Sequence, residues 1–221
     1  GRGTGVGGPD AARKGPAVSA RLHLVRHGQT PSNVAGALDT ALPGAPLTEL
    51  GREQARIVGA ELAASGISPS VVLSSEAARA RETAGLIGEQ MELDSLAVPG
   101  VHEVQAGKYE MQTGTEAMVA YNRVVRDWLE EGDLSSSLPD GESALDVQDR
   151  AMPLISELRE SYLDNGIDVV LVVHGVLMRM VAVFAGAVPS QWALDNWIPN
   201  CGIIELAPDG GGWSCQRWGD H

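Results

Sequence analysis

The segment Asp168-Val169-Val170-Leu171-Val172-Val173-His174-Gly175 decides the fold of this 221-residue chain. Its five consecutive apolar residues show no alternation with polar ones, so both faces of the predicted strand must be buried. Such a strand belongs in the middle of a parallel sheet that carries helices on both faces. The histidine and glycine at its end place an uncovered imidazole where ligands bind in sheets of this kind.

Two other predicted strands also end in polar residues. The first is Leu22 to Val25, followed by Arg26-His27-Gly28, and the second is Val71 to Leu73, followed by Ser74-Ser75. Because the carboxyl ends of parallel strands meet at one edge of a sheet, we expect His27 and His174 to face one crevice.

Helical patterns separate these strands. Thr48 is the expected N-cap of the first, and Pro153 is expected to kink or split the fourth. The segment 96–113 reads as an irregular loop, and two late strands are joined by the turn at Asp209. The chain is therefore predicted to be an α/β protein, a three-layer α/β/α sandwich with a mostly parallel central sheet. The predicted helices after Thr48 cover about 76–89, 115–130, 142–163 and 175–184, and the late strands cover 202–206 and 213–218.

The first 20 residues differ from the rest in composition. They hold six glycines and no apolar periodicity, which predicts a flexible leader outside one domain of residues 21–221. Residues 3–8 match the dinucleotide-binding pattern GxGxxG, but no strand precedes them and no helix follows. We therefore reject a dinucleotide site there.

Charge and hydrophobicity exclude several classes of function. The formal net charge is −13, which argues against binding nucleic acid or an anionic membrane surface. No apolar run approaches the roughly 20 residues of a membrane-spanning helix. An anionic substrate would need a local positive pocket in this acidic protein. Nothing resembles a signal peptide, so the cytoplasm is the expected compartment.

The chain has two cysteines, Cys201 and Cys215. They are too few and too far apart for a zinc site, which usually needs four nitrogen or sulfur ligands. We expect two reduced thiols; a disulfide would require their segments to pair as a hairpin.

Several ordered segments resemble the histidine phosphatase superfamily, also called the phosphoglycerate mutase-like family. The resemblance covers about residues 22 to 206. In chain order it rests on Leu24-Val25-Arg26-His27-Gly28-Gln29-Thr30 with Asn33, Pro46-Leu47-Thr48-Glu49-Leu50-Gly51-Arg52-Glu53-Gln54-Ala55, Ser74-Ser75 with Arg79, Ala80, Thr83 and Ala84, Glu103 with Gly107 and Glu110, Gly141-Glu142-Ser143, and Val172-Val173-His174-Gly175.

The resemblance implies a metal-independent phosphatase with no cofactor. His27 would attack phosphorus and form a phosphohistidine, for which its imidazole must be neutral and its other nitrogen hydrogen-bonded. Glu103 would give a proton to the leaving oxygen and later take one from water. The substrate would be a small phosphorylated molecule, and a homodimer is left open. The residues expected to bind the phosphate are Arg26, Asn33, Arg79 and His174.

Some neighbouring residues compete for these roles. Arg81 lies two positions after Arg79, on the opposite helix face, and is expected to be solvated. Glu110 is the alternative acid to Glu103. His23 is expected to be structural, and His102 is left out of the site.

Two tryptophans near the end of the chain have more than one possible role. Trp192 and Trp197 could line a pocket wall, although packing in the core or in an interface is the expectation.

Two features favour hydrolysis over phosphoryl transfer between substrates. Only 71 positions separate Glu103 from His174 (174 − 103), whereas family mutases carry a longer lid there. Ala37 follows Gly36 where many members have arginine, and Met111 replaces the usual glycine after Glu110. A phosphoglycerate mutase-like transferase is the alternative, and a module that binds a phosphorylated ligand without catalysis is the second alternative.

Overall fold

The computed structural model describes residues 19–221, so the rejected glycine motif and nearly all of the predicted leader lie outside the described residues. Ala20 is already part of the core. The described residues form one six-stranded sheet in the order β3-β2-β4-β1-β5-β6. The strands are β1 (Leu22–Arg26), β2 (Pro69–Ser74), β3 (Ser95–Ala97), β4 (Asp168–Val173), β5 (Ile203–Asp209) and β6 (Gly212–Trp218).

The strand predicted to be central is central. β4 lies between β2 and β1 and is parallel to both, with Leu171 in register with Leu24 and with Leu73. β3 extends the parallel half, whereas β5 runs antiparallel to β1 and to β6. The sheet is therefore mostly parallel, as the apolar run of β4 predicted.

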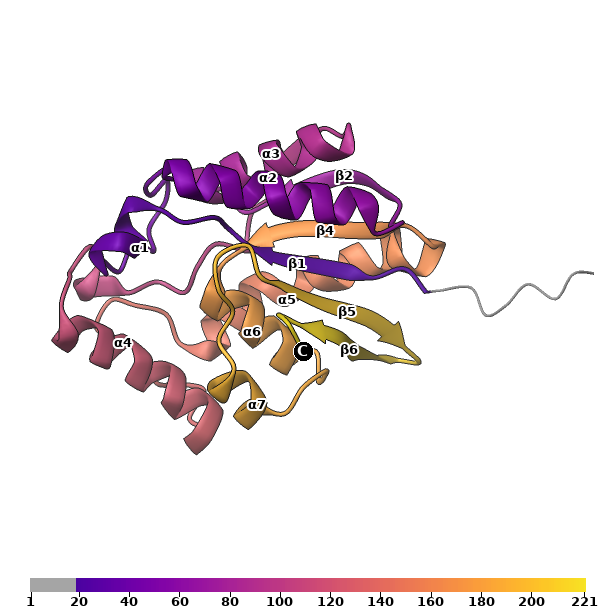
Figure 1. Cartoon of the computed structure of the whole chain (residues 1–221). Helices are drawn as coiled ribbons and strands as arrows, with labels where there is room; N and C mark the ends of the chain where they lie inside the picture. The colour runs from indigo at the N-terminus through magenta and orange to yellow at the C-terminus, as the bar shows by residue number, and fades with distance from the viewer. Residues whose placement is uncertain (1–18) are drawn as a thin grey trace, which may run out of the picture.

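Helices cover both faces of the sheet (Figure 1). α2 (Glu49–Ala64) and α3 (Ala78–Met91) lie on one face, and α5 (Ala144–Ser161) and α6 (Gly175–Phe184) lie on the other. Alternate residues of β4 supply the two cores: Val170 and Val172 pack toward α2 and α3, and Leu171 packs toward the opposite layer. The three-layer α/β/α prediction is confirmed.

Capping residues define where two of these helices begin. The hydroxyl of Thr48 accepts a hydrogen bond from the N–H of Gly51, as predicted for the N-cap of α2. Ser143 forms a capping box with Asp146 at the start of α5. α5 runs through Pro153 as one helix, so the predicted split is wrong.

Four short elements were not predicted. α1 (Pro31–Ala35) follows β1, β3 and a 3₁₀ turn (Gly107–Tyr109) lie in or beside the segment predicted to be an irregular loop, and α7 (Ser190–Asp195) precedes β5. Short elements carry too few residues for a periodic signal. α4 (Thr115–Arg126) was expected to reach residue 130 and instead changes to a π-helical turn at Asp127–Glu131.

Two glycines let the loop after β1 lie against the start of α2. A Cβ atom on Gly28 would collide with the backbone of Gly51, and one on Gly51 would collide with the backbone of Gln29. The loop and the helix therefore approach more closely than any side chain permits. This contact holds the residues after His27 in place.

The cysteines are both free thiols. β5 and β6 pair as the predicted hairpin, but Cys201 precedes β5, and Cys215 lies opposite Leu206.

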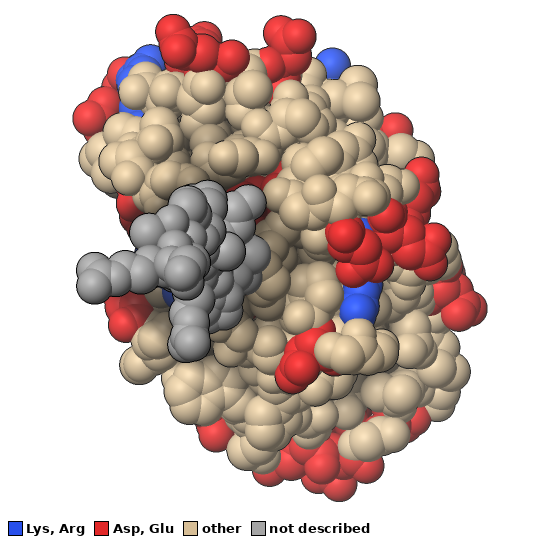
Figure 2. Space-filling model, turned by 90° about the vertical axis from the view of Figure 1, so that its right-hand side faces the viewer, with Lys and Arg blue, Asp and Glu red and all other residues tan. Residues whose placement is uncertain are grey.

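The charge of the surface and the character of the helices agree with what the composition predicted. Acidic side chains predominate over basic ones on the face shown in Figure 2. Within residues 19–221, no helix has the length and apolar character that crossing a membrane requires.

Candidate active site

Three parallel strands deliver their polar ends to one place. His27 follows β1, Ser74 ends β2 with Ser75 after it, and His174 follows β4. The imidazole rings of His27 and His174 lie with their centroids 5.2 Å apart. The structure thus brings together the two histidines that the sequence placed in one crevice.

The backbone and Arg79 hold His27 in one tautomer. Its Nδ1 lies 2.7 Å from the carbonyl oxygen of Gly28, which can only accept a hydrogen bond, so Nδ1 carries the proton. Its Nε2 accepts a hydrogen bond from Nε of Arg79 at 3.2 Å. The ring is therefore neutral, with the Nε2 lone pair facing the arginine cluster.

Burial and positive neighbours keep both histidines neutral. Burial, Arg79 and Arg26 together lower the pKa of His27 well below the usual histidine value. Burial and Arg79 lower the pKa of His174 in the same way, and His174 is fully buried. A neutral imidazole is the form that can act as a nucleophile.

Arg26 and Arg79 are only partly hydrogen-bonded. Nη1 of Arg26 donates to the carbonyl of Ile198 at 2.8 Å, and Nη2 of Arg79 donates to that of Asp39 at 2.9 Å. Nε of Arg26 and Nη1 of Arg79 are buried and have no hydrogen-bond partner among the described residues. Burial lowers the pKa of both guanidinium groups. Buried donors of this kind suit an anionic ligand, because leaving them unpaired is costly.

His174 is positioned by the end of β2. Its Nε2 lies 2.7 Å from Oγ of Ser75, and that oxygen also accepts a hydrogen bond from the N–H of Ala77. Nδ1 of His174 is buried without a partner in the described part of the chain. Ser75, the residue after β2, is thus a positioning residue that orients the ring of His174.

Asn33 lies at the rim of the site on α1. Its side-chain oxygen accepts hydrogen bonds from the N–H of Thr30 at 3.0 Å and from Nδ2 of Asn200 at 3.3 Å. Nδ2 of Asn200 also donates to the carbonyl of His27. Asn33 lines the same cavity as the two arginines.

Glu103 lies against the N-terminus of α6. Its carboxylate accepts hydrogen bonds from the N–H groups of Val176 at 3.1 Å, Leu177 at 3.0 Å and its own neighbour Val104 at 2.9 Å. The unpaired N–H groups and the dipole at a helix start attract a carboxylate. Glu103 is thus fixed by the backbone and lines the same cavity as His27.

Glu110, the competing acid, is engaged elsewhere. Its carboxylate accepts hydrogen bonds from the N–H and hydroxyl of Thr40 and from the N–H of Ala41. It ties the 40–41 backbone to the loop and does not line the cavity. Of the two carboxylates, only Glu103 is placed to exchange a proton with a ligand there.

Arg81 and His23 lie away from the two active-site histidines, whereas His102 is near enough to His174 to contribute to the lowering of its pKa. Arg81 is exposed, as expected for a residue on the far face of α3. His23 is buried at the opposite end of β1. Burial and Arg150 lower the pKa of His102.

The cavity extends well beyond His27 and the two arginines next to it. It has a volume of about 860 Å³, in the range that encloses drug-sized ligands. The sequence reading did not single out three arginines in its wall, Arg123 and Arg126 on α4 and Arg179 on α6. Arg179 is four residues after Gly175 and so lies on the same face of α6. This spacing from the histidine motif could have predicted that Arg179 lines the site.

The two tryptophans have different surroundings. Trp197 lines the cavity and is 67% exposed, so the expectation of core packing is wrong for it. Trp192 packs edge-on against Trp218 and His221 instead.

Residues 22–221 match the family model described as histidine phosphatase superfamily (branch 1). The chain belongs to this superfamily. The match begins at the first residue of β1 and continues to the end of the chain, so it includes every residue of the cluster described above.

Among curated proteins, the chain is 31% identical to glucosyl-3-phosphoglycerate phosphatase of Mycolicibacterium vanbaalenii, over 90% of this chain and 91% of that protein. It is 26% identical to a probable phosphoglycerate mutase (GpmB) of Serratia proteamaculans, over 90% and 89%. Among solved structures, a mycobacterial glucosyl-3-phosphoglycerate phosphatase in complex with VO3 matches with a TM-score of 0.77 and 28% identity, over 92% of this chain and all of that one. The chain is thus a homologue of glucosyl-3-phosphoglycerate phosphatase.

Proposed function

We propose that this chain is a metal-independent phosphomonoesterase that works through a phosphohistidine on His27. The observation that carries the proposal is the state of His27, which is neutral, has its Nδ1 proton held by Gly28, and has Nε2 directed at Arg79. A nucleophile with a fixed tautomer among anion-binding donors is what in-line attack on phosphorus requires.

In the first half of the reaction, Nε2 of His27 forms a bond to phosphorus while the bond to the leaving oxygen breaks. Arg26, Arg79 and His174 hold the non-bridging oxygens, using the buried nitrogens that lack protein partners. Asn33 adds a neutral donor at the rim. Protonated Glu103 gives its proton to the leaving oxygen.

In the second half, water attacks the phosphoryl group and the nitrogen–phosphorus bond breaks. Glu103 takes a proton from the water, which restores its acid form, and His27 returns to its neutral state. The N–H groups at the start of α6 hold the carboxyl group of Glu103 in place for this step.

The substrate we propose is a small acidic phosphoester of the phosphoglycerate type. We call Arg26, Arg79 and His174 the phosphate cluster. Three further arginines line the cavity outside it, so a second negative group can be accommodated near them: Arg123, Arg126 and Arg179. The similarity to glucosyl-3-phosphoglycerate phosphatase points to the same substrate class.

The test is release of inorganic phosphate from 3-phosphoglycerate and glucosyl-3-phosphoglycerate in excess EDTA, by the wild type and by His27→Ala. Turnover by the wild type that the substitution removes supports the phosphohistidine hydrolase. Exchange of phosphate between phosphoglycerates without net release supports the mutase instead. Binding with neither reaction supports the non-catalytic module.

Glu103→Gln separates the two proton transfers. With 4-nitrophenyl phosphate the leaving group needs no proton, so His27 is still phosphorylated, while hydrolysis of the phosphohistidine loses its base. We expect kcat to fall about 10²- to 10⁴-fold and an acid-labile phosphoenzyme to accumulate in intact-protein mass spectra. Unchanged kcat without accumulation would remove Glu103 from the mechanism.

A further inference from the structure

Trp197 is held beside the phosphate cluster with most of its ring uncovered. Its neighbour Ile198 is buried, and the Ile198 carbonyl accepts the hydrogen bond from Nη1 of Arg26. The guanidinium of Arg26 lies 5.9 Å from the centroid of the indole ring. Trp197 nevertheless stays 67% exposed at the wall of the cavity. The segment is anchored through Ile198, and Trp197 lines the cavity with much of its side chain uncovered.

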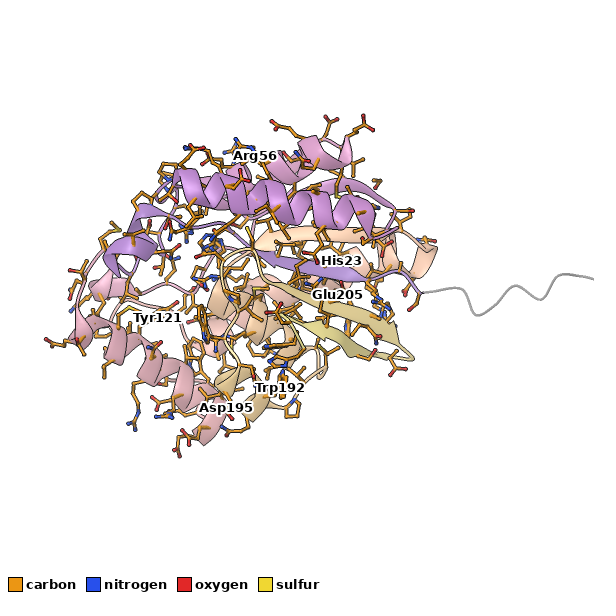
Figure 3. The ribbon with its side chains drawn as sticks, in the orientation of Figure 1. His23, Arg56, Tyr121, Trp192, Asp195 and Glu205 are labelled. Carbon is orange, nitrogen blue, oxygen red and sulfur yellow. The ribbon has the colours of Figure 1, made fainter. Side chains whose placement is uncertain are left out.

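The wall around Trp197 mixes apolar and hydrogen-bonding groups. α4 contributes Met118 and Val119, both exposed, together with the amide of Asn122. α7 contributes the carboxylate of Asp195, two residues before Trp197. Figure 3 shows Asp195 on α7, and Tyr121 on α4, the helix that carries Asn122. The wall therefore offers a flat aromatic surface beside one amide and one carboxylate.

This combination fits a sugar ring better than it fits a purely apolar group. A pyranose has a flat face of C–H groups that can cover an indole, and a rim of hydroxyls that pair with amides and carboxylates. The cavity of about 860 Å³ has room for such a ring beside a phosphoryl group on His27. Because the guanidinium of Arg26 lies over the indole ring, a sugar bound to the uncovered part of Trp197 lies close to the phosphoester.

We propose that Trp197 forms a sugar subsite, in which a pyranose ring of the leaving group stacks on the indole while Asn122 and Asp195 bind its hydroxyls. This sugar subsite rests on the proposed phosphatase function, and it makes the sugar the feature by which the enzyme selects its substrate. The enzyme would then favour a glycosylated acidic phosphoester over the same ester without its sugar.

The experiment compares kcat/KM for glucosyl-3-phosphoglycerate and 3-phosphoglycerate, two esters that differ only in the sugar. For Trp197→Ala, we expect the ratio of the two kcat/KM values to fall at least tenfold. The loss should appear in KM of the glucosylated ester, because stacking contributes equally in the ground state and the transition state. Trp197→Phe keeps an aromatic surface and should retain the ratio within about threefold.

Trp192→Ala is the matched control, because Trp192 lies on α7 but packs against Trp218 and His221 outside this cavity. It should leave the ratio unchanged. An equal loss on both esters in Trp197→Ala would overturn the subsite and make Trp197 a cover for Arg26. A loss confined to 4-nitrophenyl phosphate would overturn the sugar in favour of an aromatic ring.

Failure of the subsite and failure of the proposed function give different results. If the wild type releases no more phosphate than His27→Ala from any ester, the phosphatase function fails. If the wild type turns over both esters and the ratio does not depend on Trp197, only the sugar subsite fails.

Discussion

Strand β1 carries a buried histidine near each end, and the two have opposite surroundings. His27, just past its carboxyl end, lies among Arg26, Arg79 and His174. His23, near its amino end, lies 3.4 Å from a carboxylate oxygen of Asp168 and 3.4 Å from one of Glu205. The two positions are four residues apart in sequence, but the nearest charged groups are arginines at His27 and carboxylates at His23.

The difference determines what each imidazole can do. Burial and positive neighbours keep His27 neutral, with an unprotonated Nε2, which is the state of a nucleophile. At the other end, contact with His23 and a bond from Arg21 lower the pKa of Glu205 to about 2. Figure 3 shows His23 and Glu205 on neighbouring strands, away from Tyr121 and Asp195. His23 is thus a structural residue, as its place on the strand suggested.

The largest expected effect is the contrast between replacing the two histidines. His27→Ala should lower kcat/KM at least about 10³-fold, as loss of a nucleophile does, with little change in Tm. His23→Ala removes the imidazole packed between Asp168 and Glu205, which both keep hydrogen bonds from Arg21, and should lower stability by about 2 kcal/mol, or about 4–8 °C in Tm. Its kcat/KM should stay within about threefold.

Phosphate release and thermal unfolding of the same two preparations check this contrast. If His23→Ala lost activity as His27→Ala does, at a temperature where it is folded, the two ends of β1 would not be functionally distinct.

The second prediction concerns the arginine that makes the site positive. Arg79→Ala removes the donor to Nε2 of His27 and one ligand of the phosphate, and should lower kcat about 10²- to 10³-fold. Arg81→Ala, two residues on and exposed, is the control and should change kcat by less than about twofold. Steady-state kinetics of both variants measure this, and equal losses would show that helix α3, rather than the Arg79 guanidinium, is what matters.

The third prediction concerns stability at the amino end. Because the folded-state pKa of Glu205 is below the ordinary 4.5, its ionised form stabilises the protein above pH 4.5. That contribution is lost as the pH falls from 4.5 toward 2. Glu205→Gln should lower stability at pH 7 by about 2 kcal/mol, or about 4–8 °C in Tm.

Thermal unfolding at pH 7, 5 and 3.5 tests the sign. The gap between wild type and Glu205→Gln should narrow toward pH 3.5; a gap that widened there would contradict a lowered pKa.

In the fourth prediction, with the smallest expected effect, the protonation state of His27 does not change with pH. Since its pKa lies well below 6.5, the ring should remain the neutral Nδ1–H tautomer between pH 7 and 5.5. An unfolded chain takes up protons on its histidines in this range, so stability declines slightly as the pH falls below 6.5. Ring ¹⁵N chemical shifts, assigned with His27→Ala, measure the protonation state directly; an imidazolium signal at pH 5.5 would remove the contrast with the amino end of β1.

Short-range patterns in the chain predicted much of the fold and of the site. The apolar run 169–173 required a strand buried on both faces, and Thr48 marked the start of α2. Strand ends in a parallel sheet converge, which predicted that His27 and His174 meet, and the resemblance to the family added Arg26 and Arg79. Of the two outcomes predicted for Pro153, a kink or a split, the split is wrong, because a helix packed along its length can carry a proline that lacks one N–H.

What the sequence determined by itself was which residues are buried and which strand ends meet, since burial imprints a period on the chain. Only the tertiary structure showed that Glu103 accepts hydrogen bonds from the N–H groups of α6, that Glu110 bonds to the 40–41 backbone, and that Trp197 is uncovered beside Arg26. These outcomes join residues that loops bring together from far apart along the chain. No local pattern encodes such contacts, because the path of a loop is set by everything it packs against.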